Sequence, residues 1–99
     1  MNEKLRDTHM DELFKAILTL QSVEECYAFF DDLCTISELK AMAQRLQVAR
    51  MLDDKHVYSN VVKETGASTA TISRVNRCLH YGNDGYQLVI ERLKQNGGE

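Results

Sequence analysis

The hydrophobic positions between residues 57 and 81 follow the spacing of two short helices joined by a tight turn. The second helix is predicted over residues 69–80, with an apolar stripe that recurs every three or four residues: Ile72, Val75 and Leu79. The first is predicted over residues 58–64, with Val61 and Val62 as its apolar positions. Gly66 suits the turn because it can take a positive φ without a Cβ clash, and Ser68 can cap the second helix.

The outer face of the second predicted helix is small, polar and basic. Its residues are Thr69, Thr71, Ser73, Arg74 and Arg77. No acidic residue lies between Thr65 and Asn83. A short helix, a glycine turn and a second helix with such a face form the pattern of a helix-turn-helix, in which the second helix enters the DNA major groove by its N-terminal residues. The alternative is a plain helical hairpin within a bundle.

Two helices with apolar faces are predicted near the N-terminus. Thr8 can cap the first, with Asp11 in its first turn. The apolar positions of this helix are Met10, Leu13, Phe14, Ile17 and Leu18. Ser22 and Glu25 have the spacing of a capping box and open a second helix with a wide apolar arc. That arc is formed by Cys26, Tyr27, Phe29, Phe30, Leu33 and Cys34.

The longest helix is predicted from Ile36 to about Asp53, after a second capping box formed by Thr35 and Glu38. Its buried side is predicted to hold Leu39, Met42, Ala43, Leu46, Ala49 and Leu52, with Arg45 and Arg50 off that side. After the motif, Asp84 can cap a last helix. The apolar stripe of this last helix is Tyr86, Val89, Ile90 and Leu93. The chain has no proline and no strand pattern, so we predict one all-α domain over residues 1–99 with about six helices.

The aromatic-rich N-terminal helices carry more apolar surface than a small globule needs. The wide stripe of the helix that Ser22 opens includes Tyr27, Phe29, Phe30 and Leu33. We therefore expect a homodimer in which the N-terminal helices interlock. Helix-turn-helix proteins usually bind as two-fold dimers across paired half-sites about one DNA turn apart, which agrees with this expectation. The alternative is a monomer with a well-filled core.

The positive charge of the chain is concentrated in the candidate motif. The formal net charge is −3. Residues 1–54 hold six Lys/Arg and eleven Asp/Glu, whereas residues 55–81 hold four Lys/Arg and one acidic residue. A localised basic segment is the electrostatic footprint expected of a compact DNA reader.

Other kinds of chemistry find little support in the sequence. The three cysteines, Cys26, Cys34 and Cys78, form no CxxC pair and are expected to be buried free thiols. The three histidines lack metal-ligand spacing, so no metal is expected. We find no paired carboxylates, no nucleophile with a placed base and no phosphate loop, so an enzyme is not expected. No run approaches the about 20 apolar residues of a membrane span, and the first ten residues lack a signal-peptide core, so a cytoplasmic protein is expected.

Two segments carry a family resemblance: FFDDLCTISELKAMAQRLQVARML and GASTATISRVNRCL. They resemble the Trp repressor superfamily, and within it the branch of YerC/YecD, or TrpR-related, proteins of Gram-positive bacteria. The resemblance covers roughly residues 10–95. It implies an all-helical, intertwined homodimer that represses transcription at operator DNA.

The resemblance also implies an effector pocket. In the tryptophan-sensing member, the indole is held between two arginines, whose positions match Arg45 and Arg74 here, and Thr35 matches a further pocket residue. Val75 stands where that repressor has a glycine, and Cys78 stands where it has a serine. The valine adds bulk where the ring would pack, and the thiol is a weaker donor than a hydroxyl. Tryptophan is therefore not the expected corepressor, and another small molecule, or no effector, remains as the alternative.

The predicted DNA-binding residues lie on both helices of the motif. They are Tyr58, Ser59, Lys63, Ser68, Thr69, Ala70, Thr71, Ser73, Arg74 and Arg77. The base-reading arginine of the tryptophan repressor aligns near Ser59, so the preferred DNA sequence is expected to differ from the trp operator. We expect a sequence-specific, dimeric transcriptional repressor. The alternative is a helical protein–protein adaptor that kept the shape of the motif.

Overall fold

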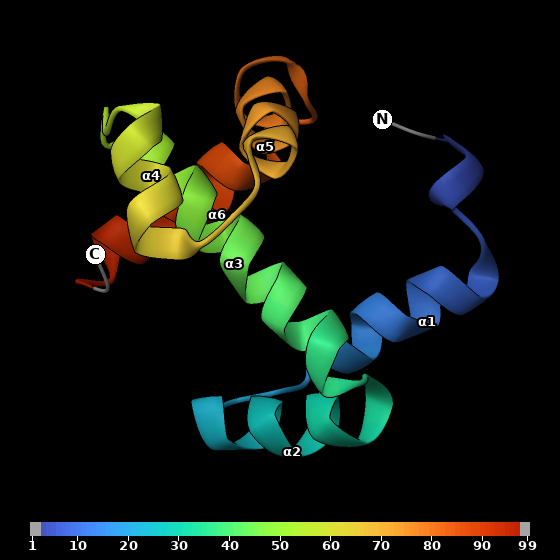
Figure 1. Cartoon of the computed structure of the whole chain (residues 1–99). Helices are drawn as coiled ribbons and strands as arrows, with labels where there is room; N and C mark the ends of the chain where they lie inside the picture. The colour runs from blue at the N-terminus through green and yellow to red at the C-terminus, as the bar shows by residue number, and fades with distance from the viewer. Residues whose placement is uncertain (1–2, 98–99) are drawn as a thin grey trace. The chain divides into compact units, whose positions relative to one another are not determined.

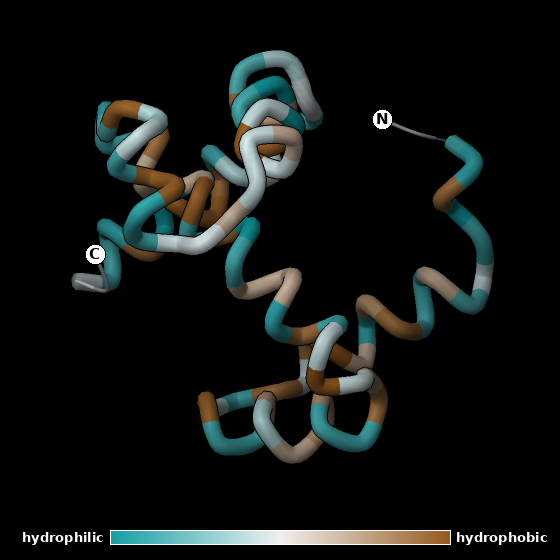
Figure 2. The backbone as a smooth tube through the Cα atoms, in the orientation of Figure 1, coloured by the Kyte–Doolittle hydropathy of each residue, from teal (hydrophilic) through white to brown (hydrophobic). Residues whose placement is uncertain are grey.

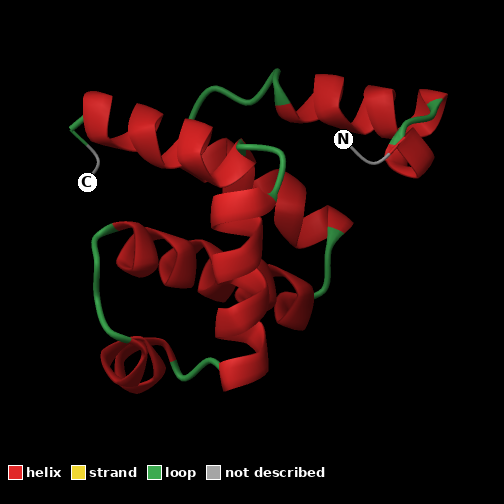
Figure 3. Cartoon of the chain, turned by 90° about the horizontal axis from the view of Figure 1, so that it is seen from above, coloured by secondary structure: helices red, strands yellow, loops and turns green. Residues whose placement is uncertain are grey.

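The computed structural model describes residues 3–97, and these residues form six α-helices and one 3-10 turn (Figures 1 and 3). The 3-10 turn is Glu3–Leu5. The helices are α1 (Thr8–Ile17), α2 (Val23–Leu33), α3 (Ile36–Asp53), α4 (Tyr58–Thr65), α5 (Thr69–Tyr81) and α6 (Gly85–Gln95). No strand occurs within residues 3–97, so the all-α prediction is confirmed.

The chain divides into two compact units, one ending at Leu39 and the other beginning at Lys40. The boundary falls inside α3, so this helix contributes its first turn to one unit and the rest to the other. The expected single domain over residues 1–99 stays a prediction.

In the N-terminal unit, α1 begins one residue earlier than a Thr8 cap would require. Asp7 is the N-cap, with an extended backbone, and its Oδ1 accepts the backbone N–H of Met10 at 2.7 Å. Thr8 is instead the first helical residue, so the predicted Thr8 cap is wrong. A carboxylate at this position also interacts favourably with the positive end of the helix dipole, which a hydroxyl does less well.

Of the two predicted capping boxes, the one at Thr35 and Glu38 is complete, and the one at Ser22 and Glu25 forms only one of its two bonds. The Oγ of Ser22 accepts the N–H of Glu25 at 3.1 Å, while Glu25 Oε1 accepts from Gln21 N rather than from Ser22 N. At α3 the box is reciprocal: Thr35 N donates to Glu38 Oε1 at 2.8 Å, and Glu38 N donates to Thr35 Oγ1 at 3.2 Å. The backbone N–H and then the hydroxyl of Thr35 lower the pKa of Glu38 below its usual 4.5, because both donate to the carboxylate.

The C-terminal unit contains the hydrophobic core, and α5 lies against both α4 and α6. Hydrophobic stretches of these helices are brown in Figure 2. The buried residues are Val48 and Ala49 of α3, Val61 of α4, Ala67 of the turn, Ile72, Val75 and Leu79 of α5, and Ile90 of α6. The apolar stripe predicted for the second helix of the motif is therefore confirmed.

The buried side of α3 differs from its prediction. Val48 is fully buried although the pattern did not select it, whereas Met42 and Ala43 are exposed. Of the other predicted positions, Ala49 is buried and Leu39, Leu46 and Leu52 are half-buried. The core of this unit includes Val48 and Ala49, in the C-terminal half of α3, whereas Met42 and Ala43 lie earlier in the helix.

The last helix begins after Asp84, as predicted, but without the predicted side-chain cap. Asp84 occupies the N-cap position, but its backbone is left-handed, with φ +65°, and its side chain makes no capping hydrogen bond. The predicted capping role of Asp84 is therefore wrong. Ile90 is buried, Tyr86 and Leu93 are half-buried, and Val89 is exposed. None of the helices within residues 3–97 has the length and apolar character needed to cross a bilayer.

Candidate nucleic-acid interface

The segment α4–turn–α5 has the geometry of the predicted helix-turn-helix. Gly66 ends α4 in the left-handed region, with φ +71°, and its N–H donates to the carbonyl of Val62 at 2.9 Å. Ser68 is the N-cap of α5, and its Oγ accepts the N–H of Thr71 at 3.1 Å. The glycine turn and the serine cap are both confirmed. They stop one helix and start the next within three residues.

The apolar stripe of α5 fixes which of its side chains face outward. Ile72, Val75 and Leu79 are at most 2% exposed, so they hold one face of the helix in the core. Several residues predicted to bind DNA are exposed on this helix or at its N-cap: Ser68, Thr69, Ala70, Ser73, Arg74 and Arg77. The first turns of α5 therefore present short side chains and the later turns present arginines, as a helix that approaches base edges by its N-terminus requires.

Thr71 differs from its neighbours on this face because it is half-buried. Its Oγ1 lies 3.1 Å from Ser68 Oγ, which donates to it, and its backbone N–H donates back to the same Ser68 oxygen. The hydroxyl of Thr71 therefore belongs to the cap of the helix. Its location at the first turn still places it beside the residues predicted to meet DNA.

Three predicted contacts lie on α4, and all of them are exposed: Tyr58, Ser59 and Lys63. Lys63, Arg74 and Arg77 form no ion pair with an acidic side chain within residues 3–97. These cations are therefore not neutralised within the described chain. Their charge is available to an external anion such as a DNA phosphate.

Two residues that hold this motif together were not predicted. Thr65 Oγ1 donates to the carbonyl of Val61 at 2.7 Å and accepts the N–H of Ala67 at 3.1 Å. Gln44 Nε2, from α3, donates to the carbonyl of Thr65 at 3.1 Å. A threonine one position before the helix-ending glycine is a sequence signal for the first pair of bonds. No local pattern indicates the bond from Gln44, because its partner is 21 residues away.

Three of the four residues of the predicted effector pocket, Arg45, Arg74 and Cys78, belong to the C-terminal unit. Thr35 lies in the N-terminal unit, where its hydroxyl is engaged in the α3 capping box. Arg45 is half-buried on α3, and Arg74 is exposed on α5. Cys78 is a half-buried free thiol that lines a hollow of about 460 Å³, and neither arginine lines that hollow. The effector pocket stays a prediction.

Cys26 and Cys34 are also free thiols, and they are half-buried. The cysteines were expected to be buried, and this expectation is wrong for all three.

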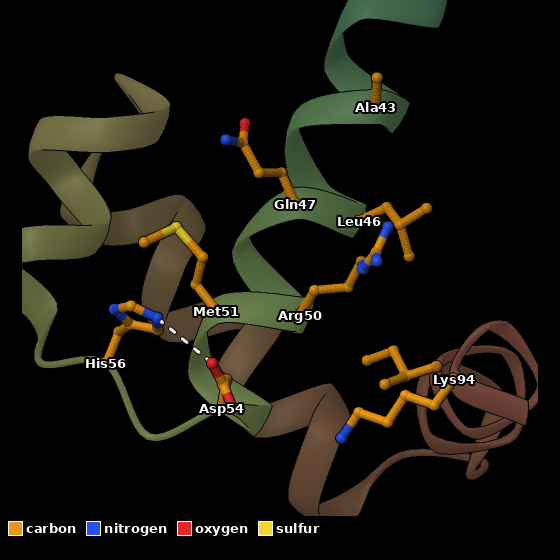
Figure 4. Close-up of a pocket in the computed structure, with 9 residues that line it drawn as sticks. Ala43, Leu46, Gln47, Arg50, Met51, Asp54, His56 and Lys94 are labelled. Atoms are coloured by element: carbon orange, nitrogen blue, oxygen red, sulfur yellow. Dashed lines mark ion pairs between the residues drawn. The ribbon is translucent and has the colours of Figure 1, made fainter. Parts of the chain in front are cut away.

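A second hollow, of about 490 Å³, lies between α3 and α6 (Figure 4). It is lined by Ala43, Leu46, Gln47, Arg50, Met51, Asp54, His56, Ile90 and Lys94. On its rim, His56 Nε2 lies 3.5 Å from Asp54 Oδ2, and Lys94 Nζ lies 3.2 Å from Oδ2 of the neighbouring Asp53. Sequence reasoning did not predict this hollow, and none of the predicted effector residues lines it.

Two short helices joined by a glycine turn, with a serine cap on the second, have the form of a helix-turn-helix, so the chain falls in the helix-turn-helix class of proteins. The family model for the Trp repressor protein matches residues 8–94, and the chain belongs to the Trp repressor family. Members of this family are DNA-binding transcription regulators rather than enzymes. The predicted resemblance and the prediction that the chain is not an enzyme are both confirmed.

Relatives of known sequence or structure agree with this assignment. The chain is 58% identical over 93 residues to YerC of Bacillus subtilis strain 168, a protein of uncharacterised function, and the match covers 94% of this chain and 89% of YerC. A Trp repressor-like crystal structure from Staphylococcus aureus is 55% identical, with a TM-score of 0.92 and 95% of each chain covered. A TrpR-like protein from Eubacterium eligens is 53% identical, with a TM-score of 0.91, and the match covers 94% of this chain and 96% of that one.

Proposed function

We propose that this protein is a sequence-specific transcriptional repressor that binds operator DNA as a homodimer. The observation that carries the proposal is the division of α5 into a buried stripe and an exposed face of short side chains followed by arginines. A helix held in this way can enter the major groove while its core contacts stay intact. Membership of the Trp repressor family supports the same reading of the helix.

Two groups of exposed residues contact different parts of the DNA in this proposal. The short residues at the start of α5, Thr69, Ala70 and Ser73, allow its backbone to approach base edges. Arg77 and Lys63, which are exposed, reach phosphates and fix the orientation of the protein on the duplex. Arg74 has the same charge and exposure and serves either the phosphates or an effector.

The homodimer is supported by the apolar surface of the N-terminal unit. No residue of α1 or α2 is buried within the described chain. Leu18 is 83% exposed and Tyr27 is 71% exposed, and Leu33 is half exposed. Apolar surface on this scale is typical of an interface, and burying it at about 25 cal/mol per Å² favours association. Two-fold symmetry would then present two copies of α5 to paired half-sites.

We also propose that tryptophan is not the effector of this protein. Val75, at the position of a glycine in the tryptophan repressor, is 1% exposed and belongs to the core stripe of α5. Its side chain is therefore packed in the core that supports α5 and cannot move aside at low cost.

The cytoplasmic location expected from the sequence also stays a prediction.

Selection of bound DNA from a random pool tests the proposed function. The purified protein should enrich one motif with two related half-sites about one DNA turn apart. A pool that stays random after several rounds, with the protein folded throughout, would contradict a DNA-reading function. Capture of a protein partner through the exposed face of α5 would then support the adaptor alternative.

A further inference from the structure

A side chain of the long helix is bonded to the turn of the helix-turn-helix. Gln44, in the middle of α3, donates from Nε2 to the backbone carbonyl of Thr65 at 3.1 Å, and this bond is partly buried. Thr65 is the last residue of α4. The final carbonyls of an α-helix have no partner within the helix, so Gln44 supplies a hydrogen bond that α4 cannot make for itself.

The hydroxyl of Thr65 forms two further hydrogen bonds in the same turn. That hydroxyl donates to the carbonyl of Val61 and accepts the N–H of Ala67, at 2.7 and 3.1 Å. Gly66 between them is left-handed, and Ala67 is only 3% exposed in the core. Hydrogen bonds to α3 and α4 therefore fix Thr65, and burial in the core fixes Ala67.

This fixed turn leads directly into the predicted reading helix. Ser68, the N-cap of α5, follows Thr65 by three residues, and α5 begins at Thr69. A displacement of the Thr65 carbonyl is therefore passed on to the first turn of α5, where base contacts are proposed. Contacts to base edges depend on the position of the helix within a fraction of an ångström, whereas long arginine and lysine side chains can still reach phosphates after a small shift.

We propose that Gln44 is a positioning residue for DNA reading: its bond to Thr65 sets the placement of the N-terminus of α5, and thereby the discrimination between DNA sequences. This inference rests on the proposed DNA-binding function. It adds to that function a residue outside the motif, one that need not touch DNA. Loss of the bond should reduce specificity while leaving the electrostatic part of binding in place.

The chain contains a matched control for this bond. Gln87 Nε2, from α6, donates to the carbonyl of Leu79 at 2.8 Å, and this bond is also partly buried. Leu79 lies near the other end of α5, in its last turns. Gln87→Met therefore removes the same kind of bond from the end of the helix that is not proposed to read bases.

The test compares Gln44→Met and Gln87→Met with the wild-type protein in three measurements. These are the melting temperature, the affinities for the selected DNA and for DNA of unrelated sequence, and amide hydrogen exchange at Ala67. Both variants should lose similar stability. In Gln44→Met the ratio of specific to non-specific affinity should fall by about tenfold or more, as for the loss of one base contact, with non-specific affinity and salt slope unchanged. Exchange at Ala67 should accelerate in this variant alone, and Gln87→Met should keep the ratio within about twofold.

The possible outcomes separate this inference from the proposed function. If the wild-type protein discriminates and Gln44→Met keeps its affinity ratio within about twofold, or if Gln87→Met loses as much, the positioning role is wrong and the bond is only structural. If the wild-type protein does not discriminate, the proposed function fails, and the reading role of Gln44 fails with it. Should Gln44→Met not fold, Gln44→Glu replaces it, since an ionised carboxylate of similar length cannot donate to the Thr65 carbonyl.

Discussion

Ser68 and Thr71 are bonded twice at the start of α5: the backbone N–H of Thr71 and the hydroxyl of Ser68 meet at 3.1 Å, and the two side-chain oxygens also lie 3.1 Å apart. The cap of the proposed reading helix is therefore made by two residues that were both predicted to face DNA. If Ser68 and Thr71 contact DNA as proposed, the same two side chains stabilise the start of α5 and bind DNA, so changes at these positions affect both stability and binding.

Ser68→Ala should destabilise the protein by about 1 kcal/mol, because it leaves the Thr71 N–H without its capping acceptor. Urea denaturation followed by circular dichroism measures this change. Ser73→Ala, at an exposed position of the same helix, is the control and should change stability by less than about 0.5 kcal/mol. Equal effects of the two variants would show that the serine cap does not support the helix.

Stability should depend on pH through Glu38. Its pKa is lowered in the folded protein by the donors of Thr35, so the ionised form is favoured by folding. The contribution is therefore fully present above the usual carboxyl pKa of 4.5 and is lost as the pH falls through the lowered value. Denaturation at a series of pH values should show this loss in the wild-type protein and a smaller one in Glu38→Gln. Identical pH profiles would contradict the role of the capping box.

The protein should sediment at low micromolar concentration with about twice the 11.3 kDa mass of one chain. Tyr27→Asp should shift it toward the monomer mass, because a charge would enter the proposed apolar interface. Tyr81→Asp is the matched control, since Tyr81 is a still more exposed tyrosine, at the end of α5, outside the N-terminal unit. A folded wild-type monomer across this concentration range would remove the dimer from the account.

Millimolar L-tryptophan should change neither the melting temperature nor the affinity for DNA. A ligand present at 100 times its dissociation constant would add about 2.7 kcal/mol, which a thermal scan detects easily. The reason for expecting no effect is the bulk of Val75 and its place in the core. A tryptophan-dependent rise in melting temperature would mean that the substitution of glycine by valine leaves room for the indole.

Local sequence patterns predicted the motif well, because its helices are decided by residues close to one another in the chain. The spacing of Ile72, Val75 and Leu79 placed α5 correctly, and Gly66 placed the turn. The first residue of a helix was harder to predict where two neighbouring polar residues could each serve as the N-cap, as Asp7 and Thr8 could at α1.

Features that depend on tertiary packing could not be predicted from the same patterns. Val48 is buried because the helices of the C-terminal unit cover that part of α3, and periodicity along α3 alone does not reveal which part is covered. The bond from Gln44 to Thr65 joins residues 21 positions apart. Helical spacing alone left open whether the motif is a DNA reader or a plain helical hairpin. The resemblance to the Trp repressor family supplied the assignment of DNA contacts.

The salt dependence of binding to the selected DNA tests the central claim most directly. The logarithm of affinity should fall linearly with the logarithm of salt concentration, and Arg77→Ala should reduce the slope by about one for each contacting copy, or about two for a dimer. Thr71→Ala should leave the slope unchanged and cost about 1–3 kcal/mol against the best site. If both folded variants bind the selected DNA with wild-type affinity and slope, α5 does not read DNA, and the account is contradicted.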